Sequence, residues 1–144
     1  MFKQRLVAVM IETITHDGVI YAVLIRAEFT AEGIKFFTPS SFSQQLGYMN
    51  RPKGYKIKPH LHKQVKREVK QTQEVLFIKS GHLKVNFFDE RKEFLQSIFL
   101  KKGDIILLAN GGHGFEMIDD SEIIEVKQGP YVGEQDKERF DDKI

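Results

Sequence analysis

Short runs of alternating apolar and polar residues, separated by turn-forming residues, make up the second half of the chain. They lie at residues 74–79, 82–88, 94–101, 104–109, 113–118 and 122–128. Alternation with a period of two puts the apolar side chains on one face of a strand, and the Gly, Asp and Ser residues between the runs favour tight turns. We therefore expect these runs to be strands, with a further strand over residues 55–62.

The first thirty residues predict a β-hairpin. Residues 5–14 and 19–29 are rich in β-branched and aliphatic residues, and the sequence His-Asp-Gly between them favours a tight turn. This hairpin is more apolar than an edge hairpin can comfortably expose. We expect it to cover the rest of the domain and to pair with a second subunit, which would make the protein a homodimer. The alternative is a hairpin that folds only on its own chain.

The remaining segments give weaker signals. Residues 33–37 predict a short strand, and residues 42–50 predict another that is interrupted by a glycine. Residues 64–72 fit either one helical turn or a flexible loop, and residues 134–144 fit a short helix. The whole chain, residues 1–144, is thus expected to be a single all-β domain, either a sandwich or a barrel. Its packed interior is expected to include Leu76, Ile78, Leu83, Val85, Phe87, Ile106, Leu108, Phe115 and Ile124.

Composition excludes several kinds of site and of location. Of the 144 residues, 41% are hydrophobic, which is enough for a packed core, and none is cysteine. The lack of cysteine excludes disulfides, zinc–thiolate sites and thiol catalysis. No apolar run is long enough to span a membrane, and the N-terminus lacks the small-residue cleavage site of a secretory signal. We expect a cytoplasmic protein with no membrane partner.

Charge is unevenly distributed, although the net charge is only +2. Residues 51–70 contain one acid, Glu68, and the bases Arg51, Lys53, Lys56, Lys58, Lys63, Lys66, Arg67 and Lys70. Such a run can be an ordinary solvated face, or it can attract a small anionic substrate. Aromatic residues are too sparse within it for a single-strand nucleic-acid interface, so we expect no nucleic-acid partner.

Three histidines and one glutamate indicate a metal or acid/base site. His60 and His62 are separated by one residue, so their imidazoles would share one face of a strand. Glu74 opens the next run, and His113 follows two glycines that let the backbone approach a bound group closely. Imidazole and carboxylate donors suit Zn, Fe, Mn, Ni or Cu. Taken singly, a pair such as His60 and His62 is common on surface strands, and His113 could be a core histidine satisfied by hydrogen bonds.

We expect an anionic substrate near this site. Lys56 and Lys58 share the strand parity of the histidine pair, so they would point toward the mouth of the pocket. An ammonium group buried there without a partner would be costly, which favours a phosphorylated or nucleotide-linked sugar, or another small acid. The candidate substrate-binding residues are Arg51, Lys56, Lys58, Phe115 and Lys127.

The spacing of these residues resembles the two signatures of the cupin superfamily. The first is matched by Gly54, five residues, His60-x-His62, and then Glu74, six residues, Gly81. The second is matched by Gly103, five residues, Ala109, Gly111 and His113. The resemblance covers residues 54–118 and implies a cupin-type jelly-roll β-barrel, here with an N-terminal β-hairpin. It also implies a divalent metal ion (Zn, Fe, Mn or Ni) held inside by His60, His62, Glu74 and His113.

Three positions depart from those signatures. The gap between His62 and Glu74 holds eleven residues, well above the usual spacing in the family. Ala109 stands where the family often has proline, and His113 comes one residue early. The long gap leaves open whether Gln73 or Glu74 faces the metal, and the early position leaves open whether His113 is a ligand.

A narrower resemblance is to the sugar 3,4-ketoisomerases, which are small cupins. His60-x-His62-Lys63 and the tail from Tyr131 to Phe140 are similar to theirs. Those enzymes use the histidine pair for acid/base chemistry without a metal. The segments QEVLFIKSG, GGHGFEMI and EVKQGPY also resemble uncharacterised cupins from bacterial surface-polysaccharide gene clusters, which implies a role in polysaccharide biosynthesis but no particular reaction.

Four functions stay open at this point. The first is a metal-dependent isomerase or epimerase on an anionic sugar, with His60, His62 and Glu74 as the catalytic residues. The second is a metal-free nucleotide-sugar ketoisomerase that uses His60 and His62 as its acid/base pair. The third is a non-enzymatic sugar- or metal-binding module, and the fourth is a non-haem dioxygenase. Metal content separates the first from the second.

Overall fold

The described part of the chain consists of β-strands and one short 3-10 helix. The computed structural model describes residues 10–144. Its strands are β1 (Ile11–His16), β2 (Val19–Ile25), β3 (Gly33–Phe36), β4 (Gly47–Asn50), β5 (Glu74–Ser80), β6 (His82–Phe88), β7 (Phe94–Lys101), β8 (Ile105–Leu108), β9 (Gly112–Met117) and β10 (Glu122–Lys127). The helical turn η1 spans Gly133–Asp136, and no α-helix occurs within residues 10–144. The all-β prediction is therefore confirmed for these residues.

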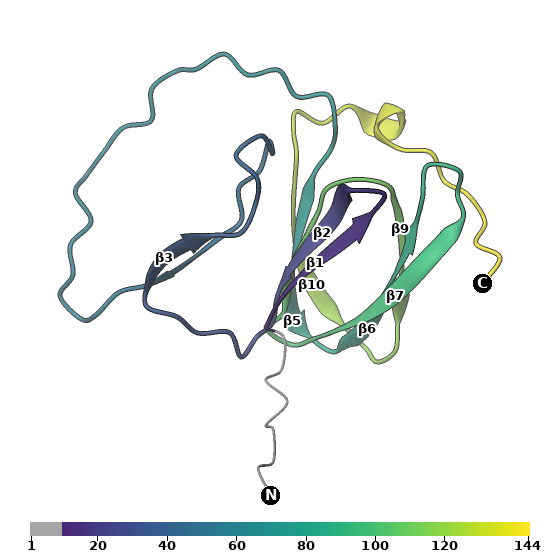
Figure 1. The fold of residues 1–144 in the computed structure, drawn as a ribbon, viewed down its shortest axis with the longest axis horizontal. Helices are drawn as coiled ribbons and strands as arrows, with labels where there is room; N and C mark the ends of the chain where they lie inside the picture. Colours follow the sequence, from purple (N-terminus) through teal and green to yellow (C-terminus); the bar gives the residue numbers. More distant parts are fainter. Residues whose placement is uncertain (1–9) are drawn as a thin grey trace, which may run out of the picture.

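Two antiparallel sheets face each other and enclose the main core (Figure 1). The larger sheet has the strand order β1-β2-β8-β5-β10, and the smaller one has the order β7-β6-β9. Side chains from the inner faces of both sheets interdigitate, as in a β-sandwich. The buried cluster between them consists of Ile14, Tyr21, Ala22, Leu24, Leu76, Ile78, Leu83, Val85, Phe87, Ile98, Leu100, Ile106 and Leu108. The described strands thus form several separate antiparallel sheets and no closed barrel.

The N-terminal hairpin is an integral part of the larger sheet. β1 and β2 are joined at Asp17 and Gly18, whose φ values of 48° and 75° suit a tight two-residue turn. β2 also pairs with β8, and both Val23 and Leu24 are fully buried. The prediction of a hairpin is confirmed, although β2 ends at Ile25 and residues 26–29 are not part of it. Residues 5–9 of the predicted first strand lie outside the described residues.

A second, smaller core lies on the other face of the larger sheet. β3 and β4 form a separate two-stranded sheet, and residues 37–46 connect them. The connecting segment packs on the larger sheet, because its Leu46 is buried with Val23, Ile25, Leu107 and Ala109. Phe37 and Phe42 are partly buried beside this cluster. The chain therefore covers part of both faces of its larger sheet.

The strands predicted in the second half of the chain lie within one residue of their expected bounds. The residues predicted for the interior are buried, with two exceptions: Phe115 is 39% exposed and Ile124 is 52% exposed. Ile124 pairs with Phe77, another exposed residue, so both belong to the outer face of the larger sheet. Phe115 lines the open cavity described below.

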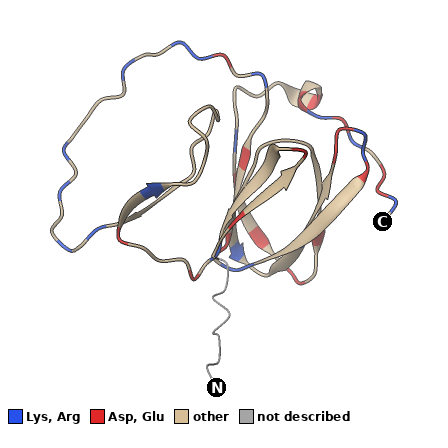
Figure 2. Cartoon of the chain, viewed as in Figure 1, with Lys and Arg blue, Asp and Glu red and all other residues tan. Residues whose placement is uncertain are grey.

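The prediction of a strand over residues 55–62 is wrong. Residues 51–71 are all exposed and run as a long loop that arches out beyond β3 (Figure 1). A strand needs a neighbour to take its backbone hydrogen bonds, and Pro59 has no N–H to donate to one. Mutual repulsion between closely spaced lysines also favours a solvated loop. Figure 2 shows basic residues spread along this loop.

Other weak predictions are corrected as well. Residues 64–72 form no helical turn and belong to the same loop. The strand expected over residues 42–50 is restricted to β4, and the helix expected over residues 134–144 is restricted to the turn η1. Among the described residues, no helix has the length and apolar character needed to cross a membrane.

Candidate functional site

Glu74 and His113 lie close together at one end of the sandwich. Glu74 is the first residue of β5 in the larger sheet, and His113 is the second residue of β9 in the smaller sheet. Oε2 of Glu74 lies 3.4 Å from Nε2 of His113. Their side chains are 13% and 27% exposed, respectively, so both are shielded but reachable. This contact brings together two of the four predicted metal ligands.

The register of β5 decides which residue faces the site. Gln73, directly before Glu74, is buried, and its side-chain oxygen accepts hydrogen bonds from the Ser43 hydroxyl (3.2 Å) and the Gln44 backbone N–H (3.0 Å). It therefore points toward the segment that covers the outer face of the larger sheet. Successive residues of an extended chain point to opposite faces, so Glu74 points to the inner side. Of the two alternatives left open by the sequence, the structure favours Glu74.

Glycines shape the turn that leads into β9. Gly111 has a φ of 71°, and a Cβ there would lie 2.2 Å from the Tyr21 ring. A Cβ at Gly112 would lie 3.2 Å from the ring of Phe140. Only glycine allows the close approach at Gly111, and a side chain at Gly112 would require the Phe140 ring to shift. The two glycines thus let the chain turn tightly into β9 just before His113. The sequence signal for this feature was the pair of glycines before His113.

An open cavity of about 1370 Å³ lies beside the pair. Its walls come from the end of the 51–71 loop, the ends of β5 and β6, the start of β9 and the C-terminal segment after β10. The lining cations are Arg67, Lys70, Lys92, Lys137 and Arg139, and the lining acids are Glu74, Asp89, Glu90, Glu125, Asp136, Glu138 and Asp142. Figure 2 shows both signs of charge on the C-terminal segment. The cavity is larger and more polar than an ordinary pocket for an apolar ligand, and its charged lining suits a ligand with several hydrogen-bonding groups.

Glu74 is held in its ionised form. The close contact with His113 lowers the pKa of the Glu74 carboxyl group, and the positive charges of Lys137 and Lys127 lower it further, against the opposing effect of burial. Lys127 is the cross-strand neighbour of Glu74 in β10. A carboxylate that stays ionised can hold an adjacent imidazole in one orientation and stabilise it when it becomes protonated.

The C-terminal segment forms one wall of the cavity through contacts at both of its ends. Phe140 packs edge-on against Phe88, with ring centroids 5.1 Å apart, and Glu138 accepts a hydrogen bond from Lys92 (2.5 Å). Nearer to β10, Asp136 accepts a hydrogen bond from the Thr72 hydroxyl and lies 3.5 Å from the Lys127 ammonium. The predicted substrate-binding residue Lys127 thus lies next to the Glu74 side of the site, and Phe115 lies beside His113 with ring centroids 5.5 Å apart.

The structure does not bring His60 and His62 to this pair. Their rings lie 5.2 Å apart on the exposed loop, and Nδ1 of His60 is 3.0 Å from its neighbouring Lys58 carbonyl. Neither residue lines the cavity. The parity argument that placed them fails because residues 55–62 are not a strand.

The donor set therefore does not fit a metal centre as it lies. Within the described residues, no group of three or more His, Cys, Asp or Glu side chains is close enough to hold a metal ion. The predicted substrate-binding residues Arg51, Lys56 and Lys58 are likewise on the exposed loop rather than at the cavity. The guanidinium of Arg51 stacks 4.5 Å above the ring of Tyr55 instead. From the basic run, only Arg67 and Lys70 reach the cavity wall.

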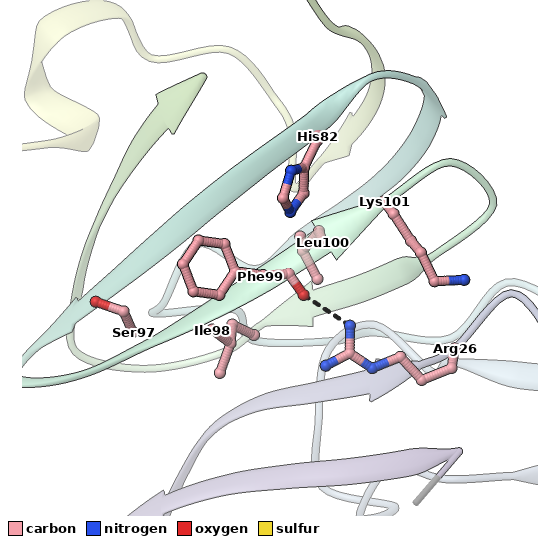
Figure 3. Close-up of a pocket in the computed structure, with 7 residues that line it drawn as sticks. All are labelled: Arg26, His82, Ser97, Ile98, Phe99, Leu100 and Lys101. Atoms are coloured by element: carbon pink, nitrogen blue, oxygen red, sulfur yellow. Dashed lines mark hydrogen bonds between the residues drawn. The ribbon is translucent and has the colours of Figure 1, made fainter. Parts of the chain in front are cut away.

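A second, smaller cavity of about 440 Å³ runs along β7 (Figure 3). Its main charged group, the guanidinium of Arg26, donates hydrogen bonds to Glu12 (2.6 Å), the Phe99 carbonyl (2.7 Å) and Asp104 (3.1 Å). Since these N–H groups are already used within the chain, Arg26 has a structural role. It directly follows β2 and links that strand to β7. This cavity offers less chemistry than the one beside Glu74 and His113.

Several residues of the site were not predicted from the sequence. Thr72, Asp136 and Lys137 surround the Glu74 side of the cavity, and Phe140 closes it. For the residues of the tail, the only sequence signal was its acidic, aromatic and basic composition, and Thr72 had none. No family model, curated protein or solved structure matches this chain. Function is therefore inferred from the residues around the Glu74–His113 pair.

Proposed function

We propose that this chain is an enzyme that moves protons on a small polar substrate of the sugar class, as an isomerase or epimerase, with His113 as the base. The observation that carries the proposal is the shielded Glu74–His113 pair beside a large polar cavity. In the neutral tautomer that carries its proton on Nε2, His113 directs this N–H at Glu74, and Nδ1 carries a free lone pair. Glu74 then orients the imidazole and compensates the positive charge that it gains.

The proposed step is a proton transfer at a carbon atom next to a carbonyl group. Nδ1 of His113 takes the proton, and the electron pair of the C–H bond forms the double bond of an enolate, whose negative charge lies on the former carbonyl oxygen. Lys137 lines the cavity, and its positive charge lowers the pKa of Glu74. In the proposed step the same charge stabilises the negative oxygen of the enolate. Delivery of a proton from water to the opposite face of the same carbon, with loss of the proton on His113 to solvent, completes an epimerisation. Return of the proton to the neighbouring carbon, with a shift of one hydroxyl proton between the two oxygens, completes an isomerisation.

The character of the cavity supports a polyhydroxylated substrate. Its lining includes acids, bases and amides, which match the donors and acceptors of sugar hydroxyl groups. Gln128 is one of the lining residues, and its buried side-chain oxygen has no hydrogen-bond partner among the described residues. The aromatic ring of Phe115 offers an apolar surface for the face of a sugar ring.

The cupin-type jelly roll belongs to the same proposal. Support for it comes from the two facing antiparallel sheets and from Glu74 and His113, which occupy positions of both sequence signatures. The resemblance to cupins is the reason to propose a sugar substrate, and the Glu74–His113 pair is the reason to propose acid/base catalysis. The geometry favours the metal-free alternative, with Glu74 and His113 rather than His60 and His62 as its acid/base residues.

Divalent-metal binding is a second, separate proposal. It would require the 51–71 loop to fold over the cavity so that His60 and His62 reach Glu74 and His113. The observation in its favour is that the two loop histidines are already close together, with ring centroids 5.2 Å apart. Since the donors do not converge as they lie, no catalytic step is assigned to a metal.

Exchange of substrate hydrogen with solvent tests the acid/base proposal without knowledge of the product. A panel of phosphorylated and nucleotide-linked sugars is incubated with the protein in D₂O, and proton NMR follows the loss of C–H signals next to carbonyl groups. The wild type should exchange at least one member of the panel. His113→Gln should slow the exchange by about 10²–10⁴-fold, the usual contribution of a general base.

His82→Gln is the matched control for that experiment. His82 also lies near a carboxylate, with Nδ1 3.9 Å from Asp119, but it lines the smaller cavity. The control variant should exchange at the wild-type rate. Exchange that survives in His113→Gln, or no exchange of any panel member by the wild type, would contradict the proposed function.

A further inference from the structure

Asp136 is held in the cavity wall by two donors that come from different parts of the chain. The Thr72 hydroxyl donates a hydrogen bond to one oxygen of its carboxylate, and the Lys127 ammonium lies 3.5 Å from the other oxygen. The Asp136 side chain is only 13% exposed, and that of Lys127 is 27% exposed. The contact with Thr72 and the charges of Lys127 and Lys137 lower the pKa of the Asp136 carboxyl group, so it is an anion at neutral pH.

These two donors lie next to the proposed catalytic pair. Thr72 precedes Glu74 by two residues, which in an extended chain corresponds to about 7 Å. Lys127 is directly opposite Glu74 across the β5–β10 register, where paired residues lie about 5 Å apart. A group bound between Thr72 and Lys127 would therefore lie beside Glu74, the partner of the proposed base His113.

We propose that Thr72 and Lys127 form an oxyanion subsite of the active site, and that Asp136 occupies it until the phosphate or carboxylate group of a substrate displaces it. A hydroxyl and an ammonium group on the two oxygens of one carboxylate are the same kind of donors that bind phosphate oxygens. In this arrangement the Asp136 carboxylate stands for the anionic group of the ligand.

The C-terminal segment can release Asp136 without leaving the domain. Asp136 is the last residue of η1, whereas the segment is anchored further on by Phe140 against Phe88. A Cβ at Gly129, before η1, or at Gly133, the first residue of η1, would meet nothing within 4 Å, so this part of the segment is not tightly enclosed. Lys137 lines the cavity, and Lys127 lies behind Asp136. Release of Asp136 would uncover the Lys127 ammonium, and the two positive charges would attract an anion.

That the subsite belongs to an active site rests on the proposed function. The test of the subsite measures only the binding of an anion. The apparent affinity for an anion is reduced by the fraction of molecules in which the subsite is free. Removing the charge of Asp136 should therefore strengthen anion binding, whereas removing the donors should abolish it. Neither effect depends on whether His113 moves a proton.

Isothermal titration calorimetry with inorganic phosphate and with glucose 6-phosphate tests the subsite in the full-length protein. Asp136→Asn should bind both ligands at least tenfold more tightly than the wild type. Adding Lys127→Met or Thr72→Val to Asp136→Asn should remove that gain. Glucose 6-phosphate that binds no more tightly than phosphate would identify a site for free phosphate, which would overturn its assignment as a substrate subsite.

Glu134→Gln is the matched control, because it removes the same charge from the same helical turn. Glu134 pairs with Arg139 (2.5 Å) rather than with the subsite. This variant should bind phosphate as the wild type does. Equal affinities of Asp136→Asn and the wild type, or an equal gain in Glu134→Gln, would overturn the proposal. If Asp136→Asn fails to fold, weak phosphate binding by the wild type must still be lost in Lys127→Met, and its persistence there would overturn the proposal as well.

Discussion

Glu74 and His113 belong to different sheets, yet Oε2 of Glu74 lies 3.4 Å from Nε2 of His113. The pair therefore links the two layers of the sandwich at the end where they open onto the cavity. A residue pair that bridges two layers depends on the spacing between them as well as on its own chemistry. Changes that loosen the sandwich should thus weaken the proposed acid/base pair even where they do not touch it.

The first prediction concerns the pH dependence of stability. Because the pKa of Glu74 is lower in the folded protein than its ordinary value of 4.5, its ionised form stabilises the fold. That contribution is complete well above pH 4.5 and is lost as the pH falls through the folded-state pKa. Replacing Glu74 by Gln should cost about 1 kcal/mol at pH 7 and should cost little at pH 3.

Urea unfolding of the wild type and Glu74→Gln between pH 3 and pH 7 measures this difference. Other acids with lowered pKa values, such as Asp136 and Glu134, change the free energy of unfolding with pH in both proteins alike, so their contributions cancel in the comparison. A difference between the two proteins that does not shrink in acid would contradict the stabilising role of the ionised carboxylate.

The second prediction concerns the turn before His113. Gly111→Ala combines a positive φ of 71° with a Cβ that would lie 2.2 Å from the Tyr21 ring, so it should destabilise the protein by more than about 2 kcal/mol. Gly18→Ala is the matched control: its φ is 75°, but its Cβ would meet nothing within 4 Å. It should cost about 1 kcal/mol, from the backbone conformation alone. Equal urea midpoints of the two variants would show that the contact with Tyr21 is unimportant.

The third prediction concerns Asp104, which is fully buried. Its two oxygens accept hydrogen bonds from the backbone N–H groups of Ala27 (2.9 Å) and Lys101 (2.9 Å) and from Arg26 (3.1 Å). Asp104→Ala leaves these donors without their acceptor, so it should cost about 3–5 kcal/mol. Asp104→Asn keeps the shape and part of the hydrogen bonding and should cost less. A urea midpoint for Asp104→Ala close to that of the wild type would contradict this role.

Local sequence patterns were enough to predict most strands of the sandwich. The alternation in residues 74–128 gave their bounds to within one residue, because inward-facing positions such as Leu76 and Leu83 are apolar in each strand. Exposure at Ile124 was not predictable in this way. Its strand is apolar on both sides, and only the position of β10 at the edge of the sheet, with Phe77 beside it, leaves the outer side in solvent.

Prediction of the site was limited by contacts between distant parts of the chain. Glu74 and His113 were identified from spacing and do meet, but the histidine pair depended on a strand that has no neighbour to pair with. The contact between Thr72 and Asp136 joins residues 64 positions apart. No local pattern marks such a contact, since threonine and aspartate are ordinary surface residues in a polar segment.

The fourth prediction concerns assembly. The N-terminal hairpin was expected to pair with a second subunit, and β1 lies at one edge of the larger sheet as the described residues form it. An edge strand has backbone groups available for pairing with another chain. Light scattering after size exclusion should therefore give the mass of a dimer, about twice 16.7 kDa, at micromolar concentration. A mass of one chain would contradict the homodimer.

The last prediction concerns whether His60 and His62 bind a divalent metal ion. His60 and His62 lie on an exposed loop, so His60→Ala/His62→Ala should leave the stability of the metal-free protein within about 0.5 kcal/mol of the wild type. If a divalent ion is bound by these residues together with Glu74 and His113, then Zn²⁺ at a hundredfold excess over its Kd should stabilise the wild type by about 2.7 kcal/mol. The double variant should lose that gain, together with the stoichiometric metal measured by plasma emission. The control variant His16→Ala/His82→Ala, which removes two other accessible histidines, should keep both. Metal uptake that persists in His60→Ala/His62→Ala would contradict the ligand assignment, and a wild type that takes up no metal after reconstitution would contradict the metal proposal itself.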